Sequence, residues 1–333
     1  SMAQAPKLRC GPFAFMAAGR VVCFATVLGC VLMCWAAFVL HAQSPVPHAE
    51  SLVPHAEFKD TCQLNRTIYF VHTSNETNLN ELQVCALTSA VRFNYDWTVV
   101  LLSNSIVHAE PNAYRVERLP YEAVFADTPF AAWYDSGVWK HGFVSNNLSN
   151  ALRLALLYKY GGAYLDLDFV SVAPLPDFAV CGCMGFQFPG EINNAVMLFP
   201  KHSRFLQAAI QEFVTNFKGG VWGWQGPKLL TRVWESVRDT AVISTRTQAG
   251  KAVNVTILGT EAFYPIPFNS SILSIMWQAP RSKLHGRHRI ISNSTIGIHF
   301  WNKVTKRFKR HRDSYVAKLC ERHTRASRGS EAG

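Results

Sequence analysis

Two aspartates, Asp166 and Asp168, close an apolar run that follows the glycine pair Gly161 and Gly162. We expect a strand over 163–170 whose alternation places both carboxylates on one face, at the end of the strand. Two like charges there repel each other and cost free energy to desolvate. A divalent cation removes that cost, and Mg²⁺ or Mn²⁺ typically binds one or two carboxylates together with the phosphates of a substrate. The alternative is a pair of strand-end aspartates that cap loop amides.

The residues before this pair predict a helix over 146–160, with Ser145 as its N-cap and Gly161 at its end. Asn150 and Arg153 are three residues apart in this helix, so they are neighbours on one face of it. In the following strand, the alternation places the side chain of Tyr164 on the same side as the two aspartates.

A second helical pattern lies nearer the N-terminus, over 80–93, between two β-branched and aromatic runs over 67–73 and 97–102. Strand, helix and strand within about 35 residues form a βαβ unit, which implies a parallel sheet with a ligand crevice at the strand ends. The predicted fold class is therefore α/β, a mainly parallel sheet flanked by helices.

Residues 21–40 form a stretch of twenty residues without a charge. As a helix this length crosses about 30 Å of hydrocarbon. Lys7, Arg9 and Arg20 precede it, so the positive-inside rule predicts a cytosolic N-terminus and a luminal main part. A cleaved signal peptide is the alternative, but its apolar region is usually about 7–15 residues long. We predict a cytosolic tail over 1–20, a transmembrane signal anchor over 21–40, a stem over 41–61, a luminal domain over 62–322 and a C-terminal tail over 323–333.

The sequons, the cysteines and the charge agree with a luminal main part. Five of the nine cysteines follow the apolar stretch, and an odd number implies one free or intermolecular thiol. We expect a disulfide between Cys62 and Cys85.

The net charge of +11 is concentrated over 281–289 and 306–312. Nucleic acid is excluded as a partner of a luminal protein, so these residues indicate a phosphate-bearing small ligand, an acidic membrane surface or a solvated basic face. The N-x-S/T sequons are at Asn65, Asn75, Asn147, Asn254, Asn269 and Asn293.

Several motifs in order give the chain a family resemblance. The segment "SNALRLALLYKYGGAYLDLDFV" over 149–170 resembles the D-x-D region of retaining glycosyltransferases with a GT-A fold. The further motifs resemble the alpha-1,4-glycosyltransferase family, in its galactosyltransferase branch, over most of residues 62–320. These motifs are "DTPFAAWY" over 127–134, "WGWQGPKLLTRVW" over 222–234, "EAFYPIPF" over 261–268 and "IGIHFWNK" over 296–303.

The resemblance implies a single-pass type II protein of the Golgi membrane whose luminal domain is the catalytic one. It would move a sugar from UDP-Gal or UDP-GalNAc to a terminal Gal or GalNAc of a glycosphingolipid, in alpha-1,4 linkage and with Mn²⁺ or Mg²⁺. The alternatives are N-acetylglucosamine transfer to glycoprotein glycans, and a non-catalytic membrane-anchored lectin or chaperone. A second copy of the chain and other Golgi glycosyltransferases are the further partners that we consider.

The resemblance also assigns site residues. Asp166 would contact the ribose or the sugar of the donor, Asp168 would bind the metal ion, and Arg153 would reach the diphosphate or the sugar. The family usually has Asp where this chain has Asn150, which can bond a sugar hydroxyl but adds no charge. His299, in the family's H-x-W-N segment, is a candidate metal ligand or diphosphate contact; a satisfied, half-buried histidine is the alternative.

The remaining candidates concern the nucleotide, the sugars and the phosphates. His72 and Thr73 end the first strand, where a uridine is expected, and Tyr164 is expected beside the donor. Lys303 would reach the phosphates. Gln225 lies between Trp224 and Gly226 in a loop that is expected to face the acceptor. Asn193 and Asn194 are expected to touch the donor sugar.

The reaction expected of this class is a front-side substitution, because no carboxylate stands out in the sequence as a covalent nucleophile. A Mg²⁺-dependent phosphohydrolase also carries D-x-D after a strand. The downstream "GPKLLT" and "WNK" segments provide no acidic pair, however, which argues against that enzyme class.

Overall fold

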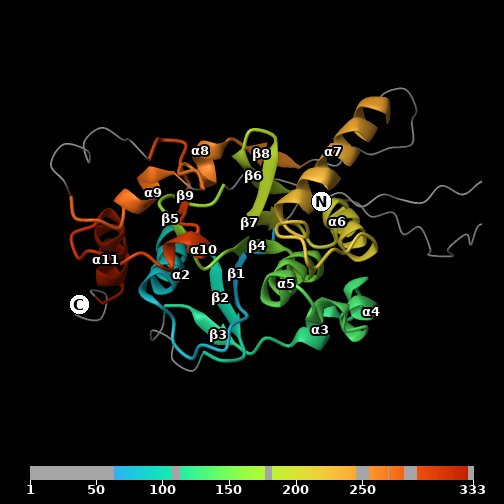
Figure 1. The fold of residues 1–333 in the computed structure, drawn as a ribbon, viewed down its shortest axis with the longest axis horizontal. Helices are drawn as coiled ribbons and strands as arrows, with labels where there is room; N and C mark the ends of the chain where they lie inside the picture. The colour runs from blue at the N-terminus through green and yellow to red at the C-terminus, as the bar shows by residue number, and fades with distance from the viewer. Residues whose placement is uncertain are drawn as a thin grey trace, which may run out of the picture. The chain divides into compact units, whose positions relative to one another are not determined.

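The structure is a computed structural model, and it describes residues 64–106, 113–176, 182–244, 255–268, 270–280 and 291–328. A seven-stranded mixed sheet lies at the centre of this part of the chain (Figure 1). The strand order is β3-β2-β1-β4-β7-β6-β8. The strands are β1 (Thr67–His72), β2 (Thr98–Ser103), β3 (Arg115–Glu117), β4 (Gly162–Leu165), β6 (Cys183–Phe188), β7 (Glu191–Phe199) and β8 (Thr256–Leu258).

The predicted α/β class is confirmed, and the predicted mainly parallel sheet is confirmed in part. Strands β3, β2, β1 and β4 are parallel to one another, and β8 is parallel to β6. Strand β7 runs antiparallel to both β4 and β6. The expected βαβ unit is present as β1, α2 (Glu81–Phe93) and β2. A capping box starts α2, since the side chain of Asn80 accepts from the backbone N–H of Gln83 at 3.0 Å and the Gln83 side chain accepts from the Asn80 N–H at 2.8 Å.

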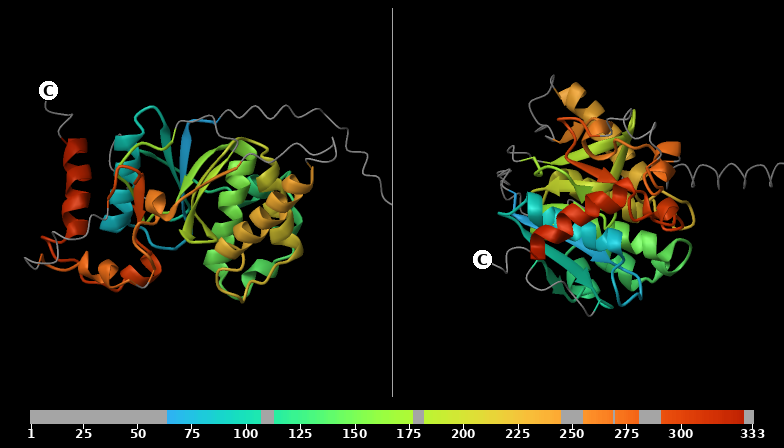
Figure 2. Two further views of the ribbon diagram at one scale, coloured as in Figure 1. Left: turned by 90° about the horizontal axis from the view of Figure 1, so that it is seen from above. Right: turned by 90° about the vertical axis from the view of Figure 1, so that its left-hand side faces the viewer.

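Helices cover both faces of the sheet (Figure 2). Neighbouring residues of one strand point to opposite faces, so Phe70 packs in one buried cluster and Val71 in the other. The Phe70 cluster includes α2, α8 (Thr260–Phe263), α9 (Ser271–Ile275) and α11 (Tyr315–Arg328). The Val71 cluster includes α3 (Tyr121–Phe125), α4 (Phe130–Asp135), α5 (Val144–Tyr160), α6 (Arg204–Thr215) and α7 (Pro227–Ser244).

The helix before the aspartates starts earlier than predicted. Helix α5 begins at Val144, and Phe143 is its N-cap without a side-chain bond, so Ser145 lies inside the helix and does not cap it. The predicted end at Gly161 is confirmed, with φ of 67°. Gly162 has φ of 110°, and a Cβ there would lie 2.4 Å from the carbonyl oxygen of Thr67. Glycine is therefore needed where the chain turns from α5 into β4.

The single strand predicted over 163–170 is wrong. The chain forms β4, then a turn, and then β5 (Phe169–Ser171), which pairs with β9 (Gly297–His299) in a separate two-stranded sheet. The turn forms because the N–H of Phe169 donates to the carbonyl of Asp166 at 2.9 Å. Asp166 and Asp168 therefore lie on a turn between two sheets, not on alternate positions of one strand.

The predicted disulfide between Cys62 and Cys85 is also wrong, because Cys85 is bonded to Cys320. Helices α2 and α11 pack against each other and bring the two Cα atoms within 5.0 Å despite a sequence separation of 235 residues. Cys183 is buried and free. Cys62 and Cys181 lie outside the described residues.

No helix within the described ranges is both long enough and apolar enough to cross a membrane. The tail predicted over 1–20, the anchor over 21–40 and the stem over 41–61 all lie outside these ranges. Helix α11 continues to Arg328, past the domain end predicted at residue 322.

Candidate active site

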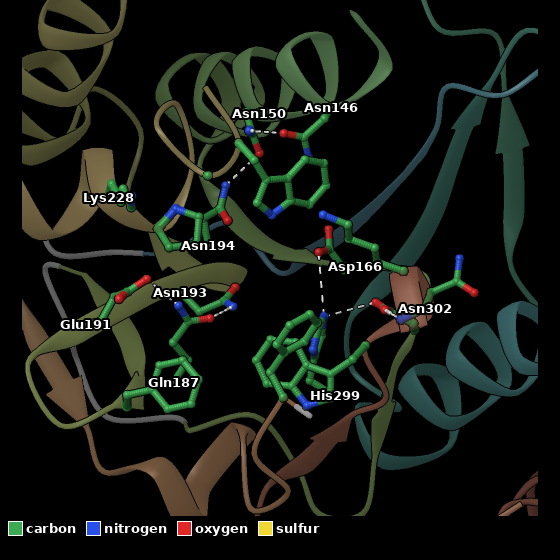
Figure 3. Close-up of a pocket in the computed structure, with 18 of the residues that line it drawn as sticks. Asn146, Asn150, Asp166, Gln187, Glu191, Asn193, Asn194, Lys228, His299 and Asn302 are labelled. Atoms are coloured by element: carbon green, nitrogen blue, oxygen red, sulfur yellow. Dashed lines mark hydrogen bonds and ion pairs between the residues drawn. The ribbon is translucent and has the colours of Figure 1, made fainter. Parts of the chain in front are cut away.

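The turn between β4 and β5 brings both aspartates to one histidine of β9. Because β5 pairs with β9, Phe169 lies opposite His299 in the register. The Nε2 atom of His299 lies 3.2 Å from Oδ1 of Asp168 and 3.9 Å from Oδ2 of Asp166 (Figure 3). One ligand atom from each of the three residues falls within 4.8 Å of the others.

Asp168 is fixed by the backbone that follows β9. Its Oδ2 accepts from the N–H of Asn302 at 2.6 Å, where α10 (Asn302–Thr305) begins. Trp301 adopts the left-handed conformation with φ of 52°, which is uncommon for a bulky residue. This turn directs the Asn302 N–H to the carboxylate, while the indole of Trp301 donates to the carbonyl of Ile266 at 2.7 Å.

The pKa values of Asp168 and His299 depend on each other. Burial alone would raise the pKa of Asp168, but the charge of His299 and hydrogen bonds from His299 and Asn302 lower it overall. Burial alone would lower the pKa of His299, but the charges of the two aspartates and their hydrogen bonds raise it to about 9. The Nδ1 atom of His299 is buried without a hydrogen-bond partner.

Arg153 of α5 holds the other aspartate. Its Nη1 lies 3.0 Å from Oδ1 of Asp166 and donates to the carbonyl of Asn194 at 2.7 Å. Its guanidinium lies over the ring of Tyr164, 4.5 Å from the centroid, and the Tyr164 hydroxyl donates to Oδ1 of Asp166 at 2.8 Å. Arg153 and Tyr164 thus orient Asp166 from two sides, and its side chain is still 26% exposed to solvent.

Amide side chains connect α5 with β7 beside these charges. Asn194 donates to Oδ1 of Asn150 at 2.8 Å, and Asn150 donates to Oδ1 of Asn146 at 3.3 Å (Figure 3). On the facing strands, Gln187 accepts from Asn193 at 2.5 Å and donates to a carboxylate oxygen of Glu191 at 2.6 Å. Amides and a carboxylate arranged in this way can bond several hydroxyl groups of a sugar.

These residues line one pocket of about 440 Å³, a volume typical of small-molecule sites. It contains Asn150, Arg153, Asp166, Asp168, Asn193, Asn194, His299 and Lys303 from the residues predicted as site residues. It also contains residues that the sequence did not single out for a role: Asn146, Gln187, Phe188, Glu191, Trp222, Gly223, Pro227, Lys228, Phe268, Trp301 and Asn302.

The loop before α7 closes one side of this pocket. Lys303 lies over the ring of Trp222 at 3.1 Å from the centroid, and both side chains line the pocket. Gln225 does not line it: the side chain is buried, and Nε2 donates to the carbonyl of Phe213 at 2.8 Å while Oε1 has no partner. In this arrangement Gln225 supports the loop.

His72 and Thr73 lie at the end of β1, outside the lining of this pocket. The ring of His72 is surrounded by hydroxyl groups, with Nε2 2.9 Å from the Ser74 hydroxyl and Nδ1 3.3 Å from those of Ser103 and Ser105. Burial lowers the pKa of His72, which keeps the ring neutral near pH 7.

The donor set fits a divalent cation. Two carboxylates and an imidazole converge on one point, Asp168 is ionised, and carboxylate oxygens suit Mn²⁺ or Mg²⁺. His299 must lose its proton before Nε2 can bind the ion. Asp166, Asp168 and His299 would hold the metal, and the rest of the pocket would surround its substrate.

Comparisons with known proteins agree with this chemistry. Residues 198–326 match the "Alpha 1,4-glycosyltransferase conserved region", and residues 80–181 match the "Glycosyltransferase sugar-binding region containing DXD motif". Human lactosylceramide 4-alpha-galactosyltransferase is 33% identical over 77% of this chain and 74% of its own length. Human alpha-1,4-N-acetylglucosaminyltransferase is 26% identical over 72% of each chain. The glycosyltransferase domain of the YGT toxin is 9% identical, with a TM-score of 0.45 over 58% of this chain and 80% of the toxin domain. The chain therefore belongs to the alpha-1,4-glycosyltransferase family, and it is a glycosyltransferase with a D-x-D sugar-binding region.

Proposed function

We propose that the chain is a retaining alpha-1,4-glycosyltransferase that moves Gal or GalNAc from a UDP-sugar to a terminal Gal or GalNAc of a glycosphingolipid. It requires Mn²⁺ or Mg²⁺, and its sheet is a nucleotide-sugar-binding fold of the GT-A type. The observation that carries the proposal is the convergence of Asp166, Asp168 and His299 in one pocket with Arg153. The names of the relatives support galactose as the sugar and a glycolipid as the acceptor.

The chain's own residues divide the work of the reaction. A bound cation would supply positive charge to the departing diphosphate. Asp166, Asp168 and His299 would hold the cation, and the Asn302 N–H keeps Asp168 in place. Asp166, which Arg153 holds in place, would also face the sugar or the ribose of the donor. Lys303 adds a second cation for the phosphates at the pocket wall.

The amide wall orients the donor sugar. Asn150 and Asn194 bond each other and present uncharged groups to the sugar hydroxyls. Since the family usually has Asp at the position of Asn150, this wall carries one negative charge less than expected. We propose that Asn150 broadens the choice between Gal and GalNAc, because an amide can both donate and accept.

The carboxylates of the pocket favour one of the two routes by which the anomeric configuration can be retained. Asp166 and Asp168 are engaged with Arg153 and His299, and the remaining lining carboxylate, Glu191, bonds Gln187. We propose front-side substitution, in which the leaving phosphate accepts the proton of the acceptor hydroxyl. A glycosyl-enzyme trapped on Glu191 and seen by mass spectrometry would overturn this step.

The apolar stretch over 21–40 and the sequons support a location in the Golgi membrane, with a single span and a luminal pocket. The predicted boundaries of tail, anchor, stem and catalytic domain belong to this proposal. A second copy and other Golgi glycosyltransferases are its candidate protein partners.

Activity of the full chain in detergent tests the proposal. UDP-Gal, UDP-GalNAc and UDP-GlcNAc are each offered with Mn²⁺ and lactosylceramide or a GalNAc-ended glycolipid. We expect transfer from one of the first two donors and a loss of at least about 100-fold in Asp168→Asn. Glu117→Gln, an exposed carboxylate at the end of β3, is the matched control and should keep full activity. Preferred transfer from UDP-GlcNAc to a glycoprotein would replace the proposal with the N-acetylglucosamine alternative, and equal activity in Asp168→Asn would refute it.

A further inference from the structure

Apolar side chains gather at the mouth of the candidate active site. Phe143 is 40% exposed, Trp222 44%, Val221 45% and Phe188 37%, and we call these four residues the apolar rim. Trp222 and Phe188 line the pocket itself. Among the described residues, these four make up half of the eight large apolar side chains that are exposed. Their concentration at one opening distinguishes them from apolar residues scattered singly over a surface.

The rim is held in place by the backbone beneath it. The rings of Phe143 and Trp222 meet edge to face with centroids 5.1 Å apart. The N–H of Phe143 and the side chain of Asn147 both donate to the carbonyl of Gly219, at 2.9 and 3.0 Å. Two hydrogen bonds thus tie the start of α5 to the loop that carries Val221 and Trp222. Phe143, Val221 and Trp222 are therefore exposed in an ordered position.

Lysines accompany the rim. Lys303 lies over the Trp222 ring, and the exposed Lys228 lines the same pocket. Lys218, also exposed, lies 4.0 Å from the ring centroid of Trp224 in the same loop. Exposed tryptophan and phenylalanine beside lysine are typical of protein surfaces that rest in the headgroup region of a bilayer.

We infer that the apolar rim docks on the lipid surface that carries the acceptor, so that the pocket mouth faces the bilayer. This inference rests on the proposed function. A glycosphingolipid keeps its ceramide in the membrane, so its terminal sugar reaches the pocket only if the mouth approaches the headgroups. Four side chains are also too few for a stable protein interface, which usually buries about 1,200–2,000 Å² in total.

A double variant, Phe143→Ser with Val221→Ser, tests the inference, because neither residue lines the pocket. The full chain is reconstituted in phosphatidylcholine vesicles that contain the glycolipid acceptor. We measure kcat/KM toward this glycolipid and toward the same glycan free of lipid. The double variant should lose about tenfold or more on the glycolipid and change less than about twofold on the free glycan. Tyr95→Ser and Tyr160→Ser, exposed aromatics outside the pocket lining, are the matched controls and should change neither value.

The other outcomes contradict the inference in distinct ways. An equal loss on both acceptors would show that the rim shapes the pocket, and no loss on either would show that it has no docking role. A third arm offers the same glycan on a soluble glycoprotein, and a selective loss there would assign the rim to a protein partner. If the unchanged chain transfers sugar to neither the glycolipid nor the free glycan, the proposed function itself fails.

Discussion

His299 links the candidate metal site to pH. In the metal-free protein the charges of the aspartates and their hydrogen bonds to the ring raise the pKa of His299 to about 9, against the effect of burial. The ring therefore carries a proton at pH 7, and this proton must leave before Nε2 binds a cation. The raised pKa thus weakens metal binding below about pH 9 and stops doing so above it.

We predict that the apparent Mn²⁺ affinity rises by up to about tenfold per pH unit between about pH 7 and 9, and levels off above. Titration calorimetry at several pH values measures it. In His299→Gln the affinity should be lower than that of the unchanged chain above about pH 9, and its pH dependence should be nearly flat. A flat profile in the unchanged chain would contradict the assignment of His299 as a ligand.

Arg153 gives a second test at the residue scale. Its planar guanidinium bonds Asp166, the Asn194 carbonyl and the Ser149 hydroxyl together, which a lysine cannot do. We predict that Arg153→Lys lowers UDP affinity by about tenfold and the free energy of unfolding by about 1–2 kcal/mol. Fluorescence titration and urea unfolding measure the two effects.

The matched control for this substitution is Arg232→Lys, since Arg232 pairs with Glu212 at 3.0 Å away from the pocket lining. Both side chains of this ion pair are more than a quarter exposed, so the loss in the free energy of unfolding should stay below about 1 kcal/mol. UDP affinity should not change in the control. Equal effects of the two substitutions on UDP binding would remove Arg153 from the donor site.

Most of the predicted site residues line one pocket. The aspartate pair could be predicted because two charges stand out in an apolar context, whereas the roles of Arg153 and His299 came from the family resemblance. Asn302 could not be found in this way, because its backbone N–H, not its side chain, bonds Asp168. Gln187 and Glu191 had no signal either, since their meeting depends on the β6–β7 hairpin.

At the scale of elements, the disulfide between α2 and α11 joins distant parts of the catalytic unit. Neither helix contributes a residue to the pocket lining. We predict that Cys85→Ala with Cys320→Ala lowers the free energy of unfolding by about 2–5 kcal/mol, because the cross-link no longer restricts the unfolded chain. UDP affinity should remain within about twofold. Urea unfolding and a UDP titration measure these effects.

Cys183→Ala is the control for the cysteine variant. Cys183 is buried and free, so this change removes a small apolar group without removing a cross-link. Its effect on stability should be clearly smaller than that of the double variant. A larger effect of Cys183→Ala would mean that packing, not the disulfide, accounts for the loss.

Local spacing predicted α2, the end of α5 and the strands β1 and β2, because each of these depends on neighbours in sequence. The split of 163–170 into β4 and β5 depends on β9, which lies more than a hundred residues later. The partner of Cys85 depends likewise on the packing of α2 against α11. Periodicity contains no information on such pairings, so these parts of the fold could not be predicted.

At the scale of the whole molecule, glycosylation tests the luminal orientation. Asn65, Asn75 and Asn293 are exposed, whereas Asn147 is 2% exposed and its side chain donates to the Gly219 carbonyl. We predict glycans on one or more of the exposed sequons and none on Asn147 when the full chain is made in animal cells. Glycopeptide mass spectrometry before and after glycosidase treatment measures this. A chain without any glycan would contradict the orientation, and a glycan on Asn147 would contradict its burial.

The most direct test of the account is the binding of UDP with and without Mn²⁺, measured by titration calorimetry on the full chain. Because Asp166, Asp168 and His299 would hold the ion that neutralises the diphosphate, we predict that Mn²⁺ strengthens UDP binding at least about tenfold. This gain should disappear in Asp168→Asn and persist in Glu117→Gln. Equal UDP affinity in the presence and absence of the ion would contradict the account.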